Sequence, residues 1–386
     1  MHKKPKTVAI LGSTGSIGSS ALDVIQAIGD QIKVVGLSAN RQLDQLIQQA
    51  RQWRPEWIVA TDENEARDFA WPALPATQID RGHARLAERV ADPELDLVVA
   101  AIVGAAGLAS TLAALVAGKD VALANKETLV VAGPLMLDAA KASGAKLLPI
   151  DSEHSAIFQA LHCGHPSEVA RVILTASGGP FRNHSPEELA HVTVEQALDH
   201  PTWEMGKKIS VDSATMMNKA LEIIEARWLF GLRPEQIDVV IHPQSIVHSM
   251  VEFRDGSILA QMSPPDMRLP IQYALTYPHR LVGTSPKLDF GRAVELQFFP
   301  PNPQQFPALE LGLEVARSGG SCGVVVNAAN EAAVAAFLAK EISFKDIVPA
   351  CRDVMRHHTF EAQPTLDELL RLDRWARQEI HRWIFA

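Results

Sequence analysis

The sequence predicts an α/β protein with an N-terminal Rossmann-like doubly wound parallel sheet, a central α+β domain and a C-terminal α-helical bundle. Three observations predict this. Apolar strand patterns alternate with helical patterns over roughly the first 150 residues, a glycine-rich turn separates the first strand from the first helix, and only helical patterns follow residue 306. Strands that alternate with helices are typical of a parallel sheet covered on both faces.

The composition bounds the class of protein. The chain has 386 residues, 47% of them hydrophobic and 21% charged, which suits a globular protein of several domains. A formal net charge of −9 argues against nucleic acid or an anionic membrane as the main partner. Cys163, Cys322 and Cys351 show no paired spacing, and the N-terminus lacks an apolar signal segment. These features predict reduced thiols in a cytoplasmic protein that is not membrane-bound.

The first strand, 7–11, runs directly into the turn Gly12-Ser13-Thr14-Gly15-Ser16-Ile17-Gly18, and a helical pattern continues to Gly29. Glycines at such a turn let the backbone approach a pyrophosphate, and the helix N-terminus offers N–H donors. The spacing is G-x-x-G-x-x-G and not the commoner G-x-G-x-x-G, so an ordinary tight turn is the alternative. Its place between a strand and a helix favours a dinucleotide site.

The second strand, 32–37, is followed by Asn40, Arg41 and Gln42. An acid at this place suits the ribose of NAD, whereas a nearby arginine suits the 2′-phosphate of NADP. We therefore expect NADPH, although Arg41 could also be an exposed helix-start residue and Asp44 is close by.

The alternation continues along the chain, with strands expected at 57–60, 95–103, 121–124 and 145–150 and helices at 84–90, 105–118 and 129–143. Ligands of a doubly wound sheet lie beyond the carboxyl ends of its strands. We expect residues 12–18, 125–127 and 151–153 along that edge. Lys126 could hold a substrate oxygen there, or it could be a surface lysine.

Asp151 and Glu153 follow the apolar run 147–150 with one residue between them. Residues i and i+2 of a strand share a face, so both carboxylates are expected to point at one spot. A hard divalent cation such as Mg²⁺ or Mn²⁺ relieves their repulsion. The alternative is a solvated helix start, where acidic residues are common.

The middle of the chain carries two further candidate features. Ser177-Gly178-Gly179 follows the predicted strand 169–175 and could form an anion-binding nest or an ordinary turn. The sparsely structured segment 182–208 contains Trp203, and we interpret it as a lid that closes on ligand.

A strong helical pattern covers 214–230, and Ser210 to Ser213 are expected to cap its start. Asn218 and Glu222 share a face of this helix, and the helix start suits a phosphate. Either Glu222 or Glu225 could serve as a third carboxylate, since periodicity does not choose between them. An exposed polar helix face is the alternative.

The rest of the chain has a hairpin pattern at 247–253 and 257–262, whose edge would suit a two-fold dimer. His242 and His248 are interpreted as structural, and Gly319, Gly320 and Gly323 as turn or hinge glycines. Helices are expected at 308–317, 326–339, 344–355 and 366–384. The predicted domains are 1–150 for NADPH binding, 151–285 for catalysis, metal binding and dimerisation, a linker at 286–305, and a helical domain at 306–386.

These segments together resemble the 1-deoxy-D-xylulose 5-phosphate reductoisomerase family. The resemblance is carried, in this order, by Gly-Ser-Thr-Gly-Ser-Ile-Gly at 12–18, Ala-Asn-Lys-Glu at 124–127, Pro-Ile-Asp-Ser-Glu-His-Ser-Ala at 149–156, Ser-Gly-Gly-Pro-Phe-Arg at 177–182, His-Pro-Thr-Trp at 200–203, Lys-Ile-Ser-Val-Asp-Ser-Ala-Thr-Met-Met-Asn-Lys at 208–219 and His-Pro-Gln-Ser-Ile-Val-His-Ser at 242–249.

The resemblance implies the roles of individual residues. It implies metal binding and catalysis by Asp151, Glu153 and Glu222, with Lys126 also catalytic. It implies substrate binding by Lys126, Ser152, Glu153, Ser177, His200, Trp203, Ser213, Asn218, Lys219 and Glu222. It implies cofactor contacts by Thr14, Gly15, Ser16, Ile17, Asn40, Arg41, Gln42, Asn125, Glu127 and Gly206. The family often has Gly-Lys-Asn where this chain has Asn40-Arg41-Gln42, so the contacts at 40–42 are the least secure.

The implied activity is the isomerisation (retro-aldol, then aldol) and reduction of 1-deoxy-D-xylulose 5-phosphate to 2-C-methyl-D-erythritol 4-phosphate in non-mevalonate isoprenoid biosynthesis. It requires NADPH and Mg²⁺, Mn²⁺ or Co²⁺, and the family implies a homodimer. Two alternatives are another NADP-dependent dehydrogenase, such as a homoserine dehydrogenase-like enzyme that needs no metal, and a non-enzymatic NADP sensor. Turnover with and without metal separates the three.

Overall fold

The computed structural model describes residues 4–203 and 205–385, so Glu204 of the expected lid lies outside the described residues. The chain divides into two compact units. The first unit comprises Met1–Thr128, Pro134–Ser155 and Asp266–Pro286, and the second comprises Leu129–Gly133, Ala156–Pro265 and Lys287–Ala386.

The first unit is built on a seven-stranded sheet in the order β4-β3-β2-β1-β5-β6-β7. Every strand pair in it is parallel, as the strand–helix alternation predicted. The strand order reverses at β1, which lies between β2 and β5, and a crevice at such a switch point is where doubly wound sheets bind ligands. The strands are β1 (Lys6–Leu11), β2 (Ile32–Ala39), β3 (Trp57–Ala60), β4 (Gln78–Arg81), β5 (Leu97–Ala100), β6 (Asp120–Leu123) and β7 (Leu147–Pro149).

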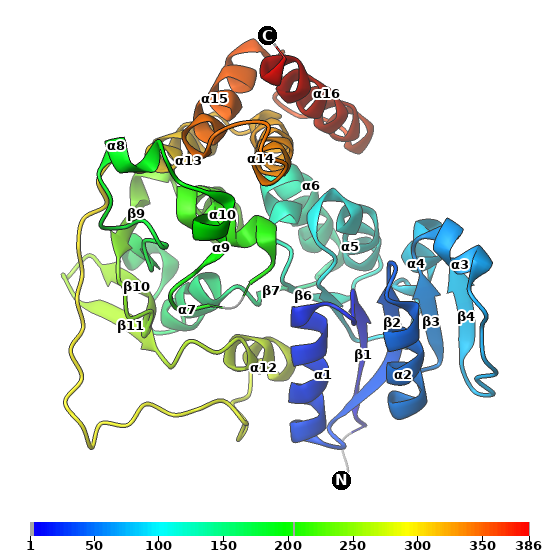
Figure 1. Cartoon of the computed structure of the whole chain (residues 1–386). Helices are drawn as coiled ribbons and strands as arrows, with labels where there is room; N and C mark the ends of the chain where they lie inside the picture. The colour runs from blue at the N-terminus through cyan, green and yellow to red at the C-terminus, as the bar shows by residue number, and fades with distance from the viewer. Residues whose placement is uncertain (1–3, 204, 386) are drawn as a thin grey trace. The chain divides into compact units, whose positions relative to one another are not determined.

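Helices connect these strands, and one helix comes from far along the chain. Helix α12 packs against α1 and against β6 and β7 (Figure 1). The sequence analysis assigned this segment to the central domain, and the four-part domain division stays a prediction. The helices are α1 (Ser16–Ile28), α2 (Leu43–Trp53), α3 (Glu63–Asp68), α4 (His83–Arg89), η1 (Gly104–Gly107), α5 (Leu108–Val116) and α12 (Arg268–Thr276). Helices α6 (Lys126–Ser143) and α7 (Ser152–Leu161) belong partly to this unit and partly to the second.

Several element boundaries in this unit differ from the expected ones. The strand expected at 95–103 ends at Ala100, and the helix expected from 105 begins as the short 3₁₀ turn η1. Gly104 has φ +71°, a conformation that stops the strand from running into the helix. Helix α6 begins three residues before its expected start and is kinked at Ala132, two residues before Pro134.

The second unit contains a four-stranded mixed sheet in the order β11-β10-β8-β9. Strand β10 is antiparallel to both β8 and β11, whereas β8 is parallel to β9. The expected hairpin is therefore confirmed as β10–β11, and β11 is an edge strand with exposed side chains at Ile258 and Leu259. The strands are β8 (Val169–Ala176), β9 (Ile237–Ile241), β10 (Val247–Phe253) and β11 (Ile258–Met262).

The helices of the second unit form the C-terminal bundle and the layer beside the sheet. Helix α11 packs on α13, and α14 packs on both α15 and α16 (Figure 1, orange to red). The helices are η2 (Pro166–Glu168), α8 (Pro186–Leu189), α9 (Val194–Leu198), α10 (Lys207–Thr215), α11 (Met217–Phe230), η3 (Pro234–Gln236), α13 (Pro307–Ser318), α14 (Cys322–Leu338), η4 (Phe344–Asp346), α15 (Ile347–His357) and α16 (Leu366–Ile384).

Two expectations for this unit were wrong. Ser210 to Ser213 do not cap a helix: they lie inside α10, and α11 begins after Met216, whose φ of +61° separates the two helices. Gly323 is not a hinge either, because it lies in α14. A Cβ at Gly323 would come within 1.9 Å of the Val130 carbonyl oxygen, so close packing requires glycine there.

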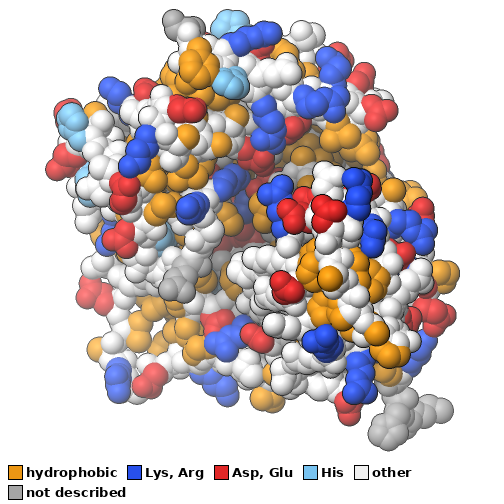
Figure 2. Space-filling model, turned by 45° about the vertical axis from the view of Figure 1, so that its right-hand side comes forward, with side chains coloured by type: hydrophobic (Ala, Val, Ile, Leu, Met, Phe, Trp, Pro, Cys, Tyr) orange, Lys and Arg blue, Asp and Glu red, His pale blue; other side chains and the backbone are white. Residues whose placement is uncertain are grey.

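The surface carries charged side chains of both signs. On the face that Figure 2 shows, positive and negative side chains are interspersed, without a broad field of one sign. Within the part of the chain that the structure describes, no helix has both the length and the apolar character to cross a membrane. The three cysteines are free, and only Cys163 is exposed.

Candidate functional site

The glycine turn after β1 is tightly enclosed at the switch point of the first sheet. Gly12 has φ +79°, and a Cβ there would lie 2.7 Å from the Ala101 carbonyl oxygen. A Cβ on Gly18 would lie 2.3 Å from the Gly12 carbonyl oxygen. The N-cap of α1 is Gly15, which has no side chain to cap the first-turn N–H groups. The turn therefore suits a phosphate group at the helix N-terminus.

The segment after β2 carries Arg41, the positively charged residue that is expected to bind the 2′-phosphate of NADPH. The Arg41 side chain is 73% exposed and its Nε lies 3.1 Å from Asp62 Oδ2. Exposed ion pairs contribute little, so a phosphate can compete for this guanidinium at small cost. Asn40 Oδ1 accepts a hydrogen bond from the Thr61 hydroxyl at 3.3 Å. Asp62 was not predicted as a site residue, although it lies just beyond the carboxyl end of β3, where ligands of such a sheet bind.

The side chain of Asn125 forms hydrogen bonds with backbone groups. Its side-chain oxygen caps α6 by accepting from Thr128 N at 3.2 Å, and its Nδ2 donates to the carbonyl oxygens of Gly104, at 2.8 Å, and Ile102. The side chain thus ties the β5–α5 loop to the end of β6. Glu127, in the first turn of α6, is buried.

Lys126, Asp151 and Glu153 meet beyond the carboxyl ends of β6 and β7. Lys126 Nζ lies 2.8 Å from Asp151 Oδ2, and the Glu153 amide donates to Asp151 Oδ1 at 3.3 Å. The Ser152 hydroxyl donates to Glu153 Oε2 at 2.6 Å. The expected strand geometry was wrong, since β7 ends at residue 149 and Glu153 lies in the first turn of α7. The helix start, and not the strand pleat, places the two acids together.

In the second unit, the turn after β8 is organised by His200. Its Nδ1 accepts from the backbone N–H groups of Thr202, at 3.2 Å, and Trp203, at 3.0 Å, so the neutral ring carries its proton on Nε2. Nε2 lies 3.2 Å from Ser177 Oγ, which also accepts from Gly179 N at 3.1 Å. Burial lowers the pKa of His200 and favours this neutral form. Ser177 is left with its hydroxyl proton to donate to an anion.

The same turn lies against the end of α10. Gly179 has φ +64°, and a Cβ there would lie 2.8 Å from the carbonyl oxygen of Ser213. Only glycine permits this close approach, which places the Ser177 turn beside Ser213. Two hydroxyl-bearing residues far apart in the sequence are thus brought together, as expected for an anion site.

Helix α11 holds the expected third carboxylate. Glu222 accepts hydrogen bonds from Asn218 Nδ2 and Lys219 Nζ, which confirms that these side chains share one helix face. The alternative of an exposed polar face is wrong, because Lys219 and Glu222 are almost fully buried. Glu225 is buried as well, so burial does not choose between the two acids.

The two histidines of the 242–249 motif have structural partners. His242 Nδ1 lies 2.8 Å from the Gln297 carbonyl oxygen, and its Nε2 accepts from Val247 N at 3.1 Å. His248 Nε2 lies 2.9 Å from Ser263 Oγ. These contacts agree with their interpretation as structural residues.

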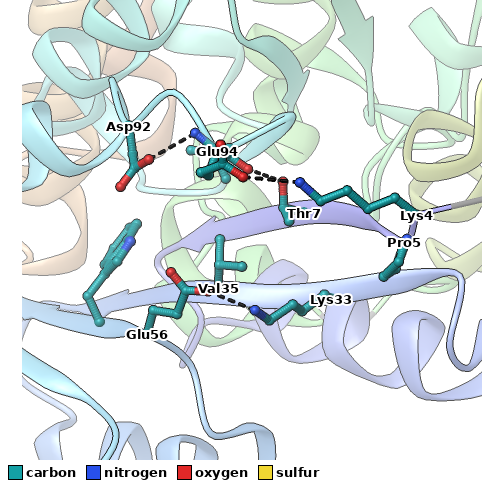
Figure 3. Close-up of a pocket in the computed structure, with 10 residues that line it drawn as sticks. Lys4, Pro5, Thr7, Lys33, Val35, Glu56, Asp92 and Glu94 are labelled. Carbon is teal, nitrogen blue, oxygen red and sulfur yellow. Dashed lines mark hydrogen bonds and ion pairs between the residues drawn. The ribbon is translucent and has the colours of Figure 1, made fainter.

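A small hollow lies at the amino ends of β1, β2 and β3 (Figure 3). Its charged residues pair with one another: Lys4 Nζ lies 3.0 Å from Glu94, and Lys33 Nζ lies 2.7 Å from Glu56. These charged residues already neutralise one another. Doubly wound proteins bind ligands at the opposite end of the sheet, so the hollow is not a candidate site.

Three protein-family models match the chain. The model described as 1-deoxy-D-xylulose 5-phosphate reductoisomerase matches residues 8–133. A model of the C-terminal domain of the same family matches residues 147–230, and a further C-terminal domain model matches residues 262–379. The chain belongs to the 1-deoxy-D-xylulose 5-phosphate reductoisomerase family.

Members of the reductoisomerase family match almost the full chain. The reductoisomerase of Rhodopirellula baltica is 49% identical, over 96% of this chain and 93% of the relative. That of Anaeromyxobacter dehalogenans is also 49% identical, over 99% of this chain and 98% of the relative.

Solved reductoisomerase structures share the fold. The Zymomonas mobilis enzyme in complex with NADPH gives a TM-score of 0.90 at 44% identity, covering 98% of this chain and 99% of that chain. A reductoisomerase in complex with NADPH, fosmidomycin and magnesium gives 0.91 at 41% identity, covering 98% of each chain. The fold class and the family resemblance predicted from sequence are both confirmed.

Proposed function

We propose that this chain catalyses the NADPH- and divalent-metal-dependent conversion of 1-deoxy-D-xylulose 5-phosphate to 2-C-methyl-D-erythritol 4-phosphate. The observation that carries the proposal is the placement of Asp151 and Glu153 beside Lys126, beyond the carboxyl ends of β6 and β7. Membership of the reductoisomerase family, and relatives solved with NADPH and magnesium, support it.

The proposed metal ligands are Asp151 and Glu153 of the first unit and Glu222 of the second, and each would offer one carboxylate oxygen to the ion. Hard oxygen donors fit Mg²⁺, Mn²⁺ or Co²⁺, and three carboxylates leave a net charge of −1 that a lysine can balance. Two of the three carboxylates already have a lysine partner, because Lys126 pairs with Asp151 and Lys219 pairs with Glu222. The proposal requires the two units to contribute to one site in the working enzyme.

When bound, the cation supplies Lewis-acid stabilisation of charge on the substrate oxygens, and NADPH supplies the hydride. The chain's own residues orient the substrate. Lys126 places a positive charge beside Asp151, where it can stabilise negative charge that develops on a substrate oxygen. The Ser152 hydroxyl, bonded to Glu153, lies at the same helix start and holds that carboxylate in place.

The substrate phosphate is proposed to bind the second unit. Ser177 has a hydroxyl proton to donate, Ser213 lies beside it, and Lys219 and Asn218 supply further donors from the first turn of α11. The neutral His200 ring is hydrogen-bonded to Ser177 and orients the Ser177 hydroxyl. Binding of this remote group holds the fragments of the sugar chain in place between bond cleavage and bond formation.

NADPH is proposed to lie along the carboxyl edge of the first sheet. The backbone of residues 14–17 would hold the pyrophosphate, and residues 40–42 the 2′-phosphate, with Arg41 exchanging Asp62 for the phosphate. Asn125, Glu127 and Gly206 complete the proposed cofactor contacts. The glycine cradle at Gly12 and Gly18, which any Cβ would obstruct, supports this placement.

Trp203 is proposed to cover the bound substrate as part of the lid at 182–208. Its amide is tied to His200 Nδ1, so movement of the tryptophan is coupled to the ring that orients Ser177. Closure would exclude water while the reactive intermediate is present.

We further propose a cytoplasmic homodimer. The exposed apolar side chains on edge strand β11, including Ile258 at 50% exposure, support pairing of this edge with a second copy. Sedimentation of the wild-type chain should give the dimer mass, and Ile258→Lys should shift it toward the monomer. A wild-type monomer at micromolar concentration would contradict this part of the proposal.

NADPH oxidation with 1-deoxy-D-xylulose 5-phosphate tests the function directly. We expect turnover that stops after chelation and returns with Mg²⁺, Mn²⁺ or Co²⁺. Full activity in the chelated enzyme would favour a metal-independent dehydrogenase, and NADPH binding without turnover would favour a sensor.

A further inference from the structure

A buried polar chain joins helix α10 to helix α14 within the second unit. Lys208 Nζ lies 2.9 Å from Asp212 Oδ2, one helical turn away. The other carboxylate oxygen, Oδ1, accepts a hydrogen bond at 2.8 Å from Nδ2 of Asn330. Asp212 is 1% exposed and Asn330 is fully buried. Both oxygens of the carboxylate are thus engaged away from bulk solvent.

Such an arrangement is sensitive to the loss of any member. A buried charge is tolerated because its partners replace the water that it lost, and removing one partner leaves the charge poorly compensated. The separation of 118 residues between Asp212 and Asn330 makes this a tertiary restraint and not a local one. Helix α10 has only nine residues and no side-chain N-cap, so its own sequence stabilises it weakly.

Asp212 lies next to residues that are proposed to bind the substrate phosphate. Asp212 directly precedes Ser213, the residue against which the Ser177 turn packs. Helix α10 ends at Thr215, and α11, which carries Asn218 and Lys219, begins at Met217. Fixing Asp212 therefore fixes the position of Ser213 and the start of the helix that supplies the other phosphate donors.

We infer that Asp212 and Asn330 form a positioning pair that holds the phosphate-binding end of α10 in place for the substrate. The inference deepens the proposed function and rests on it. Neither residue needs to contact the substrate: the pair acts through Ser213. Its loss should weaken binding of the sugar phosphate. Binding of NADPH should change little, because its proposed contacts lie at the edge of the first sheet and at Gly206, at the opposite end of α10 from Ser213.

The first test compares Asp212→Asn and Asn330→Ala with wild type. Asp212→Asn keeps the shape and removes the charge, whereas Asn330→Ala keeps the charge and removes the amide group that donates to it. We expect KM for 1-deoxy-D-xylulose 5-phosphate to rise about tenfold in the first and about threefold in the second, with KM for NADPH within about twofold of wild type. An unchanged KM for the sugar phosphate in a folded Asn330→Ala variant would overturn the inference.

Asn327→Ala is the matched control. Asn327 is a fully buried asparagine one turn earlier on α14, and its Nδ2 donates to Glu331 at 3.1 Å and not to α10. This variant should lose thermal stability but keep KM for the sugar phosphate. A rise in that KM equal to that of Asn330→Ala would show a general effect of weakening α14 and would contradict a positioning role.

Hydrogen exchange tests the restraint without substrate. Amides of 207–216 should exchange faster in Asn330→Ala than in wild type, whereas Asn327→Ala should leave them unchanged. Exchange that is unaffected in Asn330→Ala would overturn the inference even if the enzyme is active. Faster exchange in a chain whose wild type does not turn over the sugar phosphate would instead place the failure in the proposed function.

Discussion

Lys126 Nζ lies 2.8 Å from Asp151 Oδ2, so adjacent strands β6 and β7 deliver a cation and a carboxylate to the same point. Both side chains are largely buried, and the Glu153 amide donates to the second oxygen of Asp151. A divalent ion can replace the lysine as the partner of Asp151 and leave the ammonium group for the substrate. The first prediction tests this exchange.

Asp151→Asn should abolish turnover and leave NADPH affinity largely intact. The amide keeps the size of the side chain but loses the charge that a divalent cation needs, while the glycine turn at 12–18 is untouched. Steady-state rates and NADPH titration measure the two effects separately. Asp138→Asn, which removes an exposed acid on α6, should leave both unchanged. Equal losses of turnover and NADPH affinity in Asp151→Asn would argue against a metal role.

Gly18→Ala should weaken NADPH binding. The added Cβ would lie 2.3 Å from the Gly12 carbonyl oxygen, so the backbone of the turn must shift. We expect KM for NADPH to rise about tenfold or more, because the phosphate donors move with the turn. Gln26→Ala, at an exposed position on the same helix, is the control. Unchanged NADPH binding in a folded Gly18→Ala enzyme would remove the cofactor from this turn.

Trp203→Ala should raise KM for the sugar phosphate and lower kcat together. A lid contributes both to holding the substrate and to excluding water during the reaction, so both parameters depend on it. Stopped-flow fluorescence of the wild type on addition of ligand would report closure directly. Kinetics indistinguishable from wild type would show that this tryptophan does not cover the site.

The pH dependence of stability should carry a contribution from His248. Burial lowers the pKa of this histidine to about 4, whereas an unfolded histidine titrates near its ordinary value of 6.5. Between these values the unfolded chain binds a proton that the folded chain does not, so stability is lost as pH falls through this window. The expected loss between pH 7 and pH 5 is about 2 kcal/mol.

Chemical denaturation of wild type and His248→Gln at the two pH values isolates this contribution, since the carboxylates are common to both proteins. The variant should be less stable at pH 7 but should lose about 2 kcal/mol less on going to pH 5. Identical pH dependences would show that folding does not shift the pKa of this histidine and would contradict the prediction.

Strong local periodicity allowed parts of the fold to be predicted from the sequence. Strand Trp57–Ala60 and helix Leu366–Ile384 were predicted to the residue, since one is a continuous apolar run between turns and the other an amphipathic helix with a Thr365 cap. The hairpin strands were predicted to within one residue for a similar reason: Gly256 marks the turn between them.

Features that depend on distant partners were beyond the sequence. Ser210, Asp212 and Ser213 are polar residues of the kind that cap helices. In the structure Asp212 is buried, and its carboxylate accepts a hydrogen bond from Asn330, 118 residues later in the chain. Helix α12 was missed because its contacts are with α1, β6 and β7, which lie far earlier in the chain. The choice between Glu222 and Glu225 rests on tertiary geometry, to which periodicity is blind.

Anomalous diffraction from crystals grown with Mn²⁺, NADPH and a substrate analogue tests the central claim most directly, because it locates the ion and its ligands without reference to activity. The proposed site predicts one strong peak coordinated by carboxylate oxygens of Asp151, Glu153 and Glu222. A peak bound by Asp151 and Glu153 without Glu222, or no ordered ion beside them, would contradict it.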